Sequence, residues 1–187
     1  ADADADEDCA DADAPEVDWL GDGPHSAGWQ THEGVSMLRD IPLVRQTVVY
    51  YPATEAGEAT APHPSDGGYP VVFFEHAGGS HYLNYDVVFS FLASHGLVIV
   101  STDHNEVDFS MGWGWGAPDW WASHDLLFTD TIAEFELWNE TSGHPYEDLI
   151  NFDRMGMAGH SHGSALLTMQ SLGPISPFSS HSLRGVA

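Results

Sequence analysis

The chain has 187 residues, with 29 acidic side chains against four arginines and no lysine, which gives a formal net charge of −25 with histidine neutral. Nucleic acids and anionic membrane surfaces are bound through clustered lysine and arginine, so we expect neither as a partner. The hydrophobic content of 42% and the aromatic content of 12% are too high for a disordered chain, and the length suits one domain with a substantial core.

The acidic side chains are concentrated at the N-terminus. Residues 1–22 carry ten of the 29 and none of the arginines, in an Asp/Ala repeat typical of a solvated spacer. We therefore expect an acidic tail over residues 1–22 and a domain over residues 23–187. The domain keeps a net charge of −15, from 19 acids and four arginines. Such a surface favours a high-salt or extracellular setting, so we expect a secreted or cell-surface protein, with compositional drift as the alternative.

Disulfides and membrane spans are not expected. Cys9 is the single cysteine, so it has no internal partner, and its position inside the repeat argues against lipid attachment. Apolar runs such as Leu97–Val100 are far shorter than the roughly 18 residues of a membrane-spanning helix. If the protein is exported, we expect its signal peptide to have been removed already.

The first half of the chain contains two clear strand signals. Val17–Gln46 is interrupted by several glycines and a proline, and we expect it to be irregular. Arg45–Tyr51 is β-branched and aromatic, which predicts a strand. Residues 53–69 are rich in Gly, Pro, Ser and Asp and predict a surface loop. Pro70–Glu75 is apolar on both faces, which is typical of a central strand of a parallel sheet.

The remaining elements alternate helix and strand. Tyr82–Ser94 has helical spacing and ends before a glycine, and Leu97–Thr102 is a second two-sided apolar strand, so the three elements predict a right-handed βαβ unit. A helix is expected from Pro118 or Asp119 to Trp138, a strand over Ile150–Ala158, and a helix over Ala165–Leu172. The sequence predicts an open α/β sheet, mostly parallel and flanked by helices.

The segment Gly159-His-Ser-His-Gly163 has the pattern G-x-S-x-G and lies between a predicted strand and a predicted helix. In that context the serine stands on a tight turn, where flanking side chains larger than glycine would collide with the neighbouring strand and helix. The turn exposes the hydroxyl of Ser161, and the amide of His162 at the helix start can face an oxyanion. We therefore expect Ser161 to be a nucleophile.

A second oxyanion donor is expected in the loop after an earlier central strand. The small residues of His76-Ala-Gly-Gly-Ser80 follow Pro70–Glu75 and allow backbone amides to approach a substrate carbonyl. Gly78 or Ala77 is the natural donor. A plain tight turn is the alternative for this segment taken alone.

The segments VVFFEHAGGSHYLNYDVVFSFLASHGLVIVSTDH and MGMAGHSHGSALL resemble the α/β-hydrolase superfamily, and within it the branch of platelet-activating-factor acetylhydrolases, chlorophyllases, dienelactone hydrolases and cutinase-like polyester hydrolases. The resemblance covers about residues 45–172. It implies Ser161 as the nucleophile and the amides of His162 and Gly78 as the oxyanion hole. The chain departs from the family at Ala77, where the family prefers glycine.

A larger departure follows the serine. In this fold an acid and then a histidine come after the nucleophile in the chain, whereas the residues after the predicted helix contain His181 and no acid. His181 is too close to the serine turn for us to assign it as the base. We expect that the chain is the N-terminal two thirds of a longer enzyme or that it has lost its general base.

Other histidines have ordinary interpretations. His160 and His162 flank the serine on opposite sides of a tight turn, so they are not expected to share a metal, and we expect neither a metal nor a cofactor. His104 follows a strand at the edge where ligand crevices form, so it is a candidate substrate contact or a hydrogen-bonded loop residue. His124 and Asp125 lie near a predicted helix start, where capping is the usual role.

A tryptophan-rich segment and the Asp-rich tail are two further candidates for ligand binding. Trp113 and Trp115, with Trp120 and Trp121, are candidates for an apolar wall of a substrate site or for packing over the sheet. The Asp-rich tail lacks the glycine-containing loop of a calcium-binding EF-hand.

The sequence therefore predicts a serine esterase or lipase that acts on a small-molecule or polymeric ester. The alternative is a non-catalytic, truncated or degenerate hydrolase domain. A peptidase or thioesterase on the same fold is a third possibility.

Overall fold

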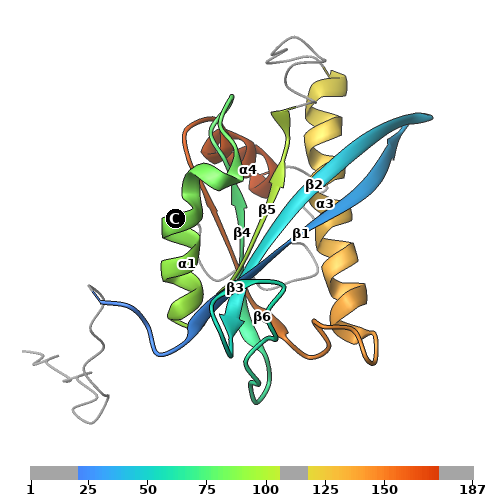
Figure 1. Cartoon of the computed structure of the whole chain (residues 1–187). Helices are drawn as coiled ribbons and strands as arrows, with labels where there is room; N and C mark the ends of the chain where they lie inside the picture. The colour runs from blue at the N-terminus through green and yellow to red at the C-terminus, as the bar shows by residue number, and fades with distance from the viewer. Residues whose placement is uncertain (1–20, 106–117, 173–187) are drawn as a thin grey trace, which may run out of the picture.

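The computed structural model describes residues 21–105 and 118–172 (Figure 1). They form a six-stranded mixed sheet with the order β3-β1-β2-β5-β4-β6. The strands are β1 (Ser26–Leu38), β2 (Ile41–Ala53), β3 (Gly57–Glu58), β4 (Tyr69–Glu75), β5 (Val98–Asp103) and β6 (Ile150–Gly159). The helices are the short 3-10 helix η1 (Tyr82–Tyr85), α1 (Asp86–Ser94), α3 (Pro118–Glu140) and α4 (His162–Leu172).

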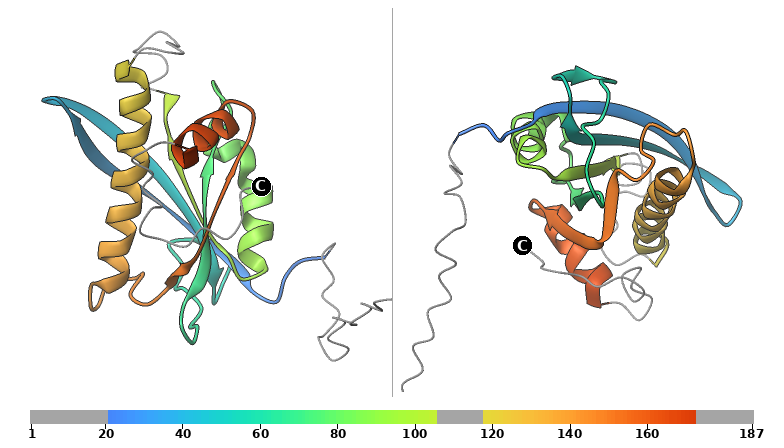
Figure 2. Two further views of the ribbon diagram at one scale, coloured as in Figure 1. Left: turned by 180° about the vertical axis from the view of Figure 1, so that it is seen from behind. Right: turned by 90° about the horizontal axis from the view of Figure 1, so that it is seen from below.

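Helices cover both faces of the sheet. Successive residues of a strand point to opposite faces, and in β2 this alternation supplies two separate cores. Val49 and Tyr51 join the larger core, which includes buried side chains of α3 and α4. Val48 and Tyr50 join the smaller one, against Phe89 of α1. Figure 2 shows α1 on a different side of the sheet from α3 and α4, so the predicted α/β architecture is confirmed.

The parallel part of the sheet lies where the sequence predicts it. β4 pairs in parallel with β5 on one side and with β6 on the other. The segment between β4 and β5 forms η1 and α1, which completes the expected βαβ unit. Carboxyl ends of parallel strands meet at one edge of a sheet, so the segments after β4, β5 and β6 come together there.

The expectation for Val17–Gln46 is wrong over most of its length. β1 and β2 pair as an antiparallel hairpin from Ser26 opposite Ala53 to Leu38 opposite Ile41. Arg39 (φ 47°) and Asp40 (φ 73°) form its two-residue turn; two left-handed residues in succession match the twist of paired strands. The end of the hairpin projects past α3 (Figure 1).

Glycines led to that error. Gly28 and Gly34, which suggest a break in the sequence, lie inside β1 because neighbouring side chains cross them. A Cβ on Gly28 would lie 2.7 Å from the ring of Tyr51, and one on Gly34 would lie 2.7 Å from the guanidinium of Arg45. These glycines accommodate close packing and do not interrupt the strand.

The other elements differ little from expectation. The predicted loop over residues 53–69 contains the two-residue strand β3, which pairs in parallel with β1. The helix expected from 118 to 138 ends at Glu140, and the last helix begins at His162, three residues before its predicted start. No helix within the described residues is long and apolar enough to cross a membrane.

Candidate active site

Ser161 occupies a strained turn between a strand and a helix. β6 ends at Gly159 and α4 begins at His162, so two residues make the whole connection. Ser161 has a φ of 55°, a left-handed conformation that costs a non-glycine residue about 1–2 kcal/mol. Its side chain is exposed. An exposed hydroxyl on a strained strand-to-helix turn has the local geometry of a nucleophile elbow.

The two glycines of the motif are required by contacts with backbone. A Cβ on Gly159 would lie 2.8 Å from the carbonyl carbon of Gly163, and a Cβ on Gly163 would lie 2.1 Å from the carbonyl oxygen of Glu75. Distances below 3.0 Å to backbone atoms require the backbone to shift. The predicted collision with the neighbouring strand and helix is confirmed, with β4 as the strand and α4 as the helix.

Hydrogen bonds hold this turn against the central strand. The N–H of His160 donates to the carbonyl of Glu75 at 3.1 Å, and the N–H of Gly163 donates to the carbonyl of His160 at 3.0 Å. The hydroxyl of Ser164 donates to the carbonyl of Gly159 at 2.6 Å. The position of Ser161 is therefore set by β4 as well as by its own strand and helix.

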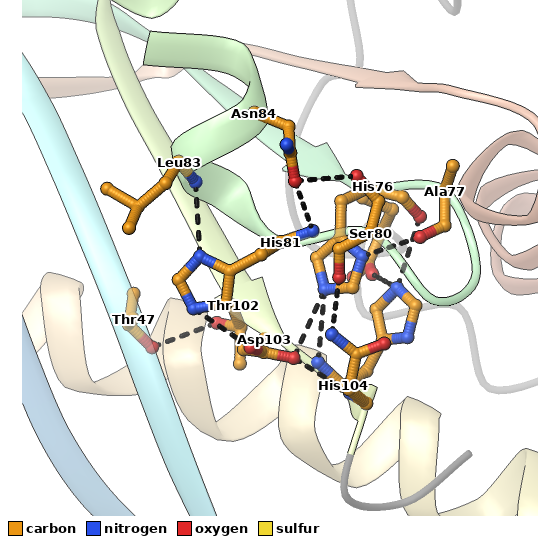
Figure 3. Close-up of polar contacts among 12 residues, drawn as sticks. Thr47, His76, Ala77, Ser80, His81, Leu83, Asn84, Thr102, Asp103 and His104 are labelled. Atoms are coloured by element: carbon orange, nitrogen blue, oxygen red, sulfur yellow. Dashed lines mark hydrogen bonds and ion pairs between the residues drawn. The ribbon is translucent and has the colours of Figure 1, made fainter. Parts of the chain in front are cut away.

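The loop after β4 begins with a compact turn (Figure 3). The carbonyl of Ala77 accepts hydrogen bonds from the N–H of Ser80 at 2.9 Å and from Nδ1 of His76 at 2.9 Å. The N–H of Ala77 donates to the hydroxyl of Tyr85 at 3.0 Å. The Ala77 amide is thus engaged within the protein, which leaves the amide of Gly78 as the candidate oxyanion donor of this loop.

The loop and the serine turn are joined by Tyr85. Its hydroxyl, which accepts the N–H of Ala77, also lies 2.9 Å from Nδ1 of His160. Its ring packs on Phe74 and Phe89, with centroid separations of 4.8 and 5.7 Å. A side chain of η1 therefore contacts both segments of the candidate oxyanion site.

Two stacked histidines lie beneath the loop. The rings of His76 and His104 are parallel within 10° with centroids 3.8 Å apart, and both are buried, at 0% and 2% exposure. Nε2 of His104 lies 3.5 Å from the carboxylate of Glu75, and Nε2 of His76 lies 3.4 Å from that of Asp103. Each buried histidine therefore faces one carboxylate, which suits the rule that a buried polar group needs a partner.

Asp103, the last residue of β5, connects this pair to the loop surface. Its Oδ2 lies 3.2 Å from Nε2 of His81, and its Oδ1, which faces His76, also accepts the N–H of Asn105 at 2.8 Å. Burial raises the pKa of Asp103, but the hydrogen bonds from His76 and from the Asn105 N–H, together with the charges of His76 and His81, outweigh burial and lower it. Asp103 is therefore a carboxylate at neutral pH.

His76 has the opposite shift. Burial lowers the pKa of His76, but the hydrogen bonds with Asp103 and with the Ala77 carbonyl, and the charges of Glu75 and Asp103, outweigh burial and raise it. Protonated His76 donates from Nε2 to Asp103, whereas neutral His76 can accept the N–H of His104, 3.3 Å away, at the same atom. The charge of His76 thus decides which of two partners it binds.

An aromatic cluster supports the start of α4. The ring of His162 is stacked on Trp120 of α3, with centroids 5.3 Å apart and planes within 5°. His124 is buried and packs on Trp120 at 4.4 Å and edge-on to His104 at 5.0 Å. The capping role expected for His124 and Asp125 is wrong, because both lie inside α3, six and seven residues after its first residue.

The structure brings most of the predicted site residues to one edge of the sheet. Ser161, His162, Ala77 and Gly78 lie in the adjoining segments after β6 and β4, and His104 lies after β5, buried against His76. Trp113, Trp115 and His181 lie outside the described residues. Their catalytic and oxyanion roles stay predictions.

Sequence reasoning missed Tyr85, Asp103 and His81 as members of this site. Tyr85 lies at helical spacing with apolar neighbours and is therefore interpreted as part of a helix face. The spacing does not show which groups its hydroxyl binds. Asp103 had a usable signal, since it ends a parallel strand at the edge where ligand sites form.

Within the described residues, no group of three or more His, Cys, Asp or Glu side chains is arranged to hold a metal ion.

Comparisons with known proteins identify the fold. No protein-family model and no curated protein matches the chain. Among solved structures, a ferulic acid esterase from Streptomyces cinnamoneus is 15% identical to this chain, with a TM-score of 0.56, over 83% of this chain and 56% of the esterase. The chain therefore spans a little more than half the length of that esterase. At such low identity the likeness shows the fold alone, an α/β sheet flanked by helices that this chain shares with that esterase.

Proposed function

We propose that this protein is a serine hydrolase of carboxylic esters that forms an acyl-enzyme on Ser161. The observation that carries the proposal is the exposed Ser161 with its φ of 55° on a two-residue turn between β6 and α4. A side chain is kept in such a conformation only when the surrounding structure imposes it, which is typical of a functional position. The esterase with the same fold supports an ester as the substrate class.

In the proposed reaction the hydroxyl oxygen of Ser161 attacks the ester carbonyl. The tetrahedral oxyanion accepts hydrogen bonds from the amide of His162, the first residue of α4, and from the amide of Gly78. Collapse of this intermediate breaks the bond to the alcohol, which takes up the proton removed from the serine. Water then attacks the acyl-enzyme and releases the acid.

In other hydrolases of this fold the proton acceptor is a histidine that follows the nucleophile in the chain. Among the described residues after Ser161, His162 is buried against Trp120 and is better placed to support the turn than to accept the proton. The stacked pair of His76 and His104 is also buried and faces Glu75 and Asp103. We assign these histidines to support of the site and not to proton transfer from Ser161.

A fluorophosphonate probe tests the proposal, because it reacts covalently only with an activated serine. We expect the protein to be labelled at Ser161, as located by peptide mass spectrometry, and to hydrolyse p-nitrophenyl acetate and butyrate. Ser161→Ala should abolish both signals. Ser90→Ala is the matched control, since Ser90 lies on α1, which packs on the other face of the sheet from α4.

Absence of both labelling and hydrolysis in folded protein would overturn the proposal. That result would favour the alternative, a hydrolase-type domain that does not catalyse the reaction. Circular dichroism and thermal unfolding of the same preparation establish that the protein is folded. Labelling at a serine other than 161 would likewise contradict the assignment of the nucleophile.

A further inference from the structure

The hydroxyl of Tyr85 bridges two segments that are distant in the sequence. It contacts the N–H of Ala77 at 3.0 Å, eight residues away, and Nδ1 of His160 at 2.9 Å, 75 residues away. Ala77 belongs to the loop after β4, and His160 is the residue before Ser161. The bridge therefore connects the candidate oxyanion loop directly to the serine turn.

The chemistry of a phenolic hydroxyl allows both contacts of this bridge at the same time. A tyrosine hydroxyl has one proton to donate and two lone pairs to accept with. The Ala77 N–H uses one lone pair, so the contact with His160 is either donation of the tyrosine proton to Nδ1 or acceptance of a proton from it. In both cases the oxygen is held from two sides and links the loop to the turn.

The contacts of Ala77 determine the direction of the Gly78 amide. The carbonyl of Ala77 and the N–H of Gly78 belong to one planar trans peptide group, in which they point in opposite directions. The carbonyl is held by Ser80 and His76 (Figure 3), and Tyr85 holds the preceding N–H. Because Ala77 is fixed on both sides, the direction of the Gly78 N–H is fixed as well.

We infer that Tyr85 is a positioning residue for the oxyanion site: its hydroxyl sets the orientation of the Gly78 amide relative to Ser161. This inference rests on the proposed function, because the Gly78 amide needs an orientation only if it stabilises an oxyanion. The aromatic ring has a separate task, packing on Phe74 and Phe89. Removing the hydroxyl therefore tests the bridge without removing the packing.

Tyr85→Phe is the direct test, and Tyr50→Phe is its matched control. Tyr50 donates to Asp86 in the first turn of α1 at 2.6 Å and packs on Phe89, but it contacts neither the loop after β4 nor the serine turn. Both variants lose one tyrosine hydroxyl near the start of α1. We expect Tyr85→Phe alone to lower kcat on p-nitrophenyl butyrate by about 10-fold or more, with KM changed less than about two-fold, because loss of an oxyanion donor acts in the transition state.

Variants of His160 test the other end of the bridge. In His160→Asn the side-chain oxygen takes the place of Nδ1, so the contact with Tyr85 is kept, and we expect kcat within about three-fold of wild type. His160→Leu cannot make the contact and should resemble Tyr85→Phe. The double variant Tyr85→Phe/His160→Leu should be little worse than either single variant, because both remove the same interaction; additive losses would overturn the inference.

Hydrogen exchange gives a readout that does not depend on activity. The Ala77 amide should exchange at least about 10-fold faster in Tyr85→Phe than in wild type and unchanged in Tyr50→Phe, because only the first loses its acceptor. Unchanged exchange at Ala77, or equal kcat in the two variants, overturns the inference while leaving the proposed function intact. Failure of the wild-type protein to react at Ser161 overturns the proposed function, and with it any catalytic meaning of the bridge.

Discussion

Gly163, in the first turn of α4, lies directly against the carbonyl of Glu75, the last residue of β4. A Cβ on Gly163 would stand 2.1 Å from that oxygen. The helix that follows the serine therefore approaches the central strand as closely as backbone allows. This contact explains why the motif ends in glycine, and it makes the position unusually sensitive to substitution.

Gly163→Ala should lower the free energy of unfolding by about 3 kcal/mol, the upper end of the usual cost of overpacking, and should abolish labelling of Ser161 by displacing the turn. Gly143→Ala is the control. Gly143 has a φ of 81°, and a Cβ there would meet nothing within 4 Å, so only the conformational cost of about 1 kcal/mol applies. Urea unfolding measures the free energy of unfolding of both variants. Equal losses of this free energy would show that the contact with Glu75 is unimportant.

The contacts of Asp103 predict a pH-dependent stability. Asp103→Asn should lower the free energy of unfolding by about 1–3 kcal/mol near pH 5.5, because it removes the charge that faces His76 and His81. Asp66→Asn removes an exposed acid from the loop over residues 53–69 and should have little effect.

The direction in which stability changes with pH follows from the pKa shifts of His76 and Asp103. The raised pKa of His76 gives stability that is complete below its unfolded value of 6.5 and is lost as the pH rises through the folded value. The lowered pKa of Asp103 gives stability that is complete above its unfolded value of 3.8 and is lost as the pH falls through the folded value. The difference between wild type and Asp103→Asn should be largest between these values and should shrink by pH 9; a difference independent of pH would contradict the pairing.

His32 predicts a loss of stability in mild acid. Burial, with a smaller contribution from His144, lowers the pKa of His32 to about 4 from 6.5, and Nε2 of His32 lies 2.8 Å from the hydroxyl of Tyr146. The unfolded chain therefore binds the proton first, and stability should fall as the pH drops from 6.5 to about 4. His32→Gln should flatten the thermal unfolding profile over this range. His63→Gln, at an exposed position, should change it less, because His63 helps to lower the pKa of His25 but burial of His25 is the larger cause.

The buried guanidinium of Arg45 depends on its partner in α3. Nη1 of Arg45 lies 3.2 Å from Glu134 and 3.2 Å from the hydroxyl of Thr131, and Arg45 is 5% exposed. Glu134→Gln should lower the free energy of unfolding by about 2 kcal/mol because it leaves a buried charge without its counter-charge. Glu140→Gln, at the exposed end of α3, is the control.

A second substitution tests that explanation. Arg45→Met in the Glu134→Gln background should recover part of the lost stability, because the uncompensated charge is then absent. Denaturant unfolding of the four proteins forms a complete double-mutant cycle. A further loss of stability in the double variant would show that Arg45 contributes mainly through packing of its methylene groups.

The amino-acid sequence determined the elements whose signal is local. Two-sided apolar runs predicted β4 and β5, and helical spacing predicted η1 with α1, because burial on both faces of a sheet or on one face of a helix imposes a short period on the chain. The serine turn was predictable because a five-residue pattern between a strand and a helix marks it, although the contact that requires Gly163 is made with Glu75 of β4.

Only the tertiary structure revealed the β1–β2 hairpin and the polar contacts around the serine turn. Apolar and polar residues alternate irregularly in β1, which also contains Gly28 and Gly34. The structure explains these glycines, because the side chains of Tyr51 and Arg45 lie across them. Tyr85 and His160 are 75 residues apart, and Asp103 meets His76 and His81 across two strands. A hydrogen bond between distant residues leaves no period in the sequence, so the partner of each polar group is decided by where the sheet brings the strand ends together.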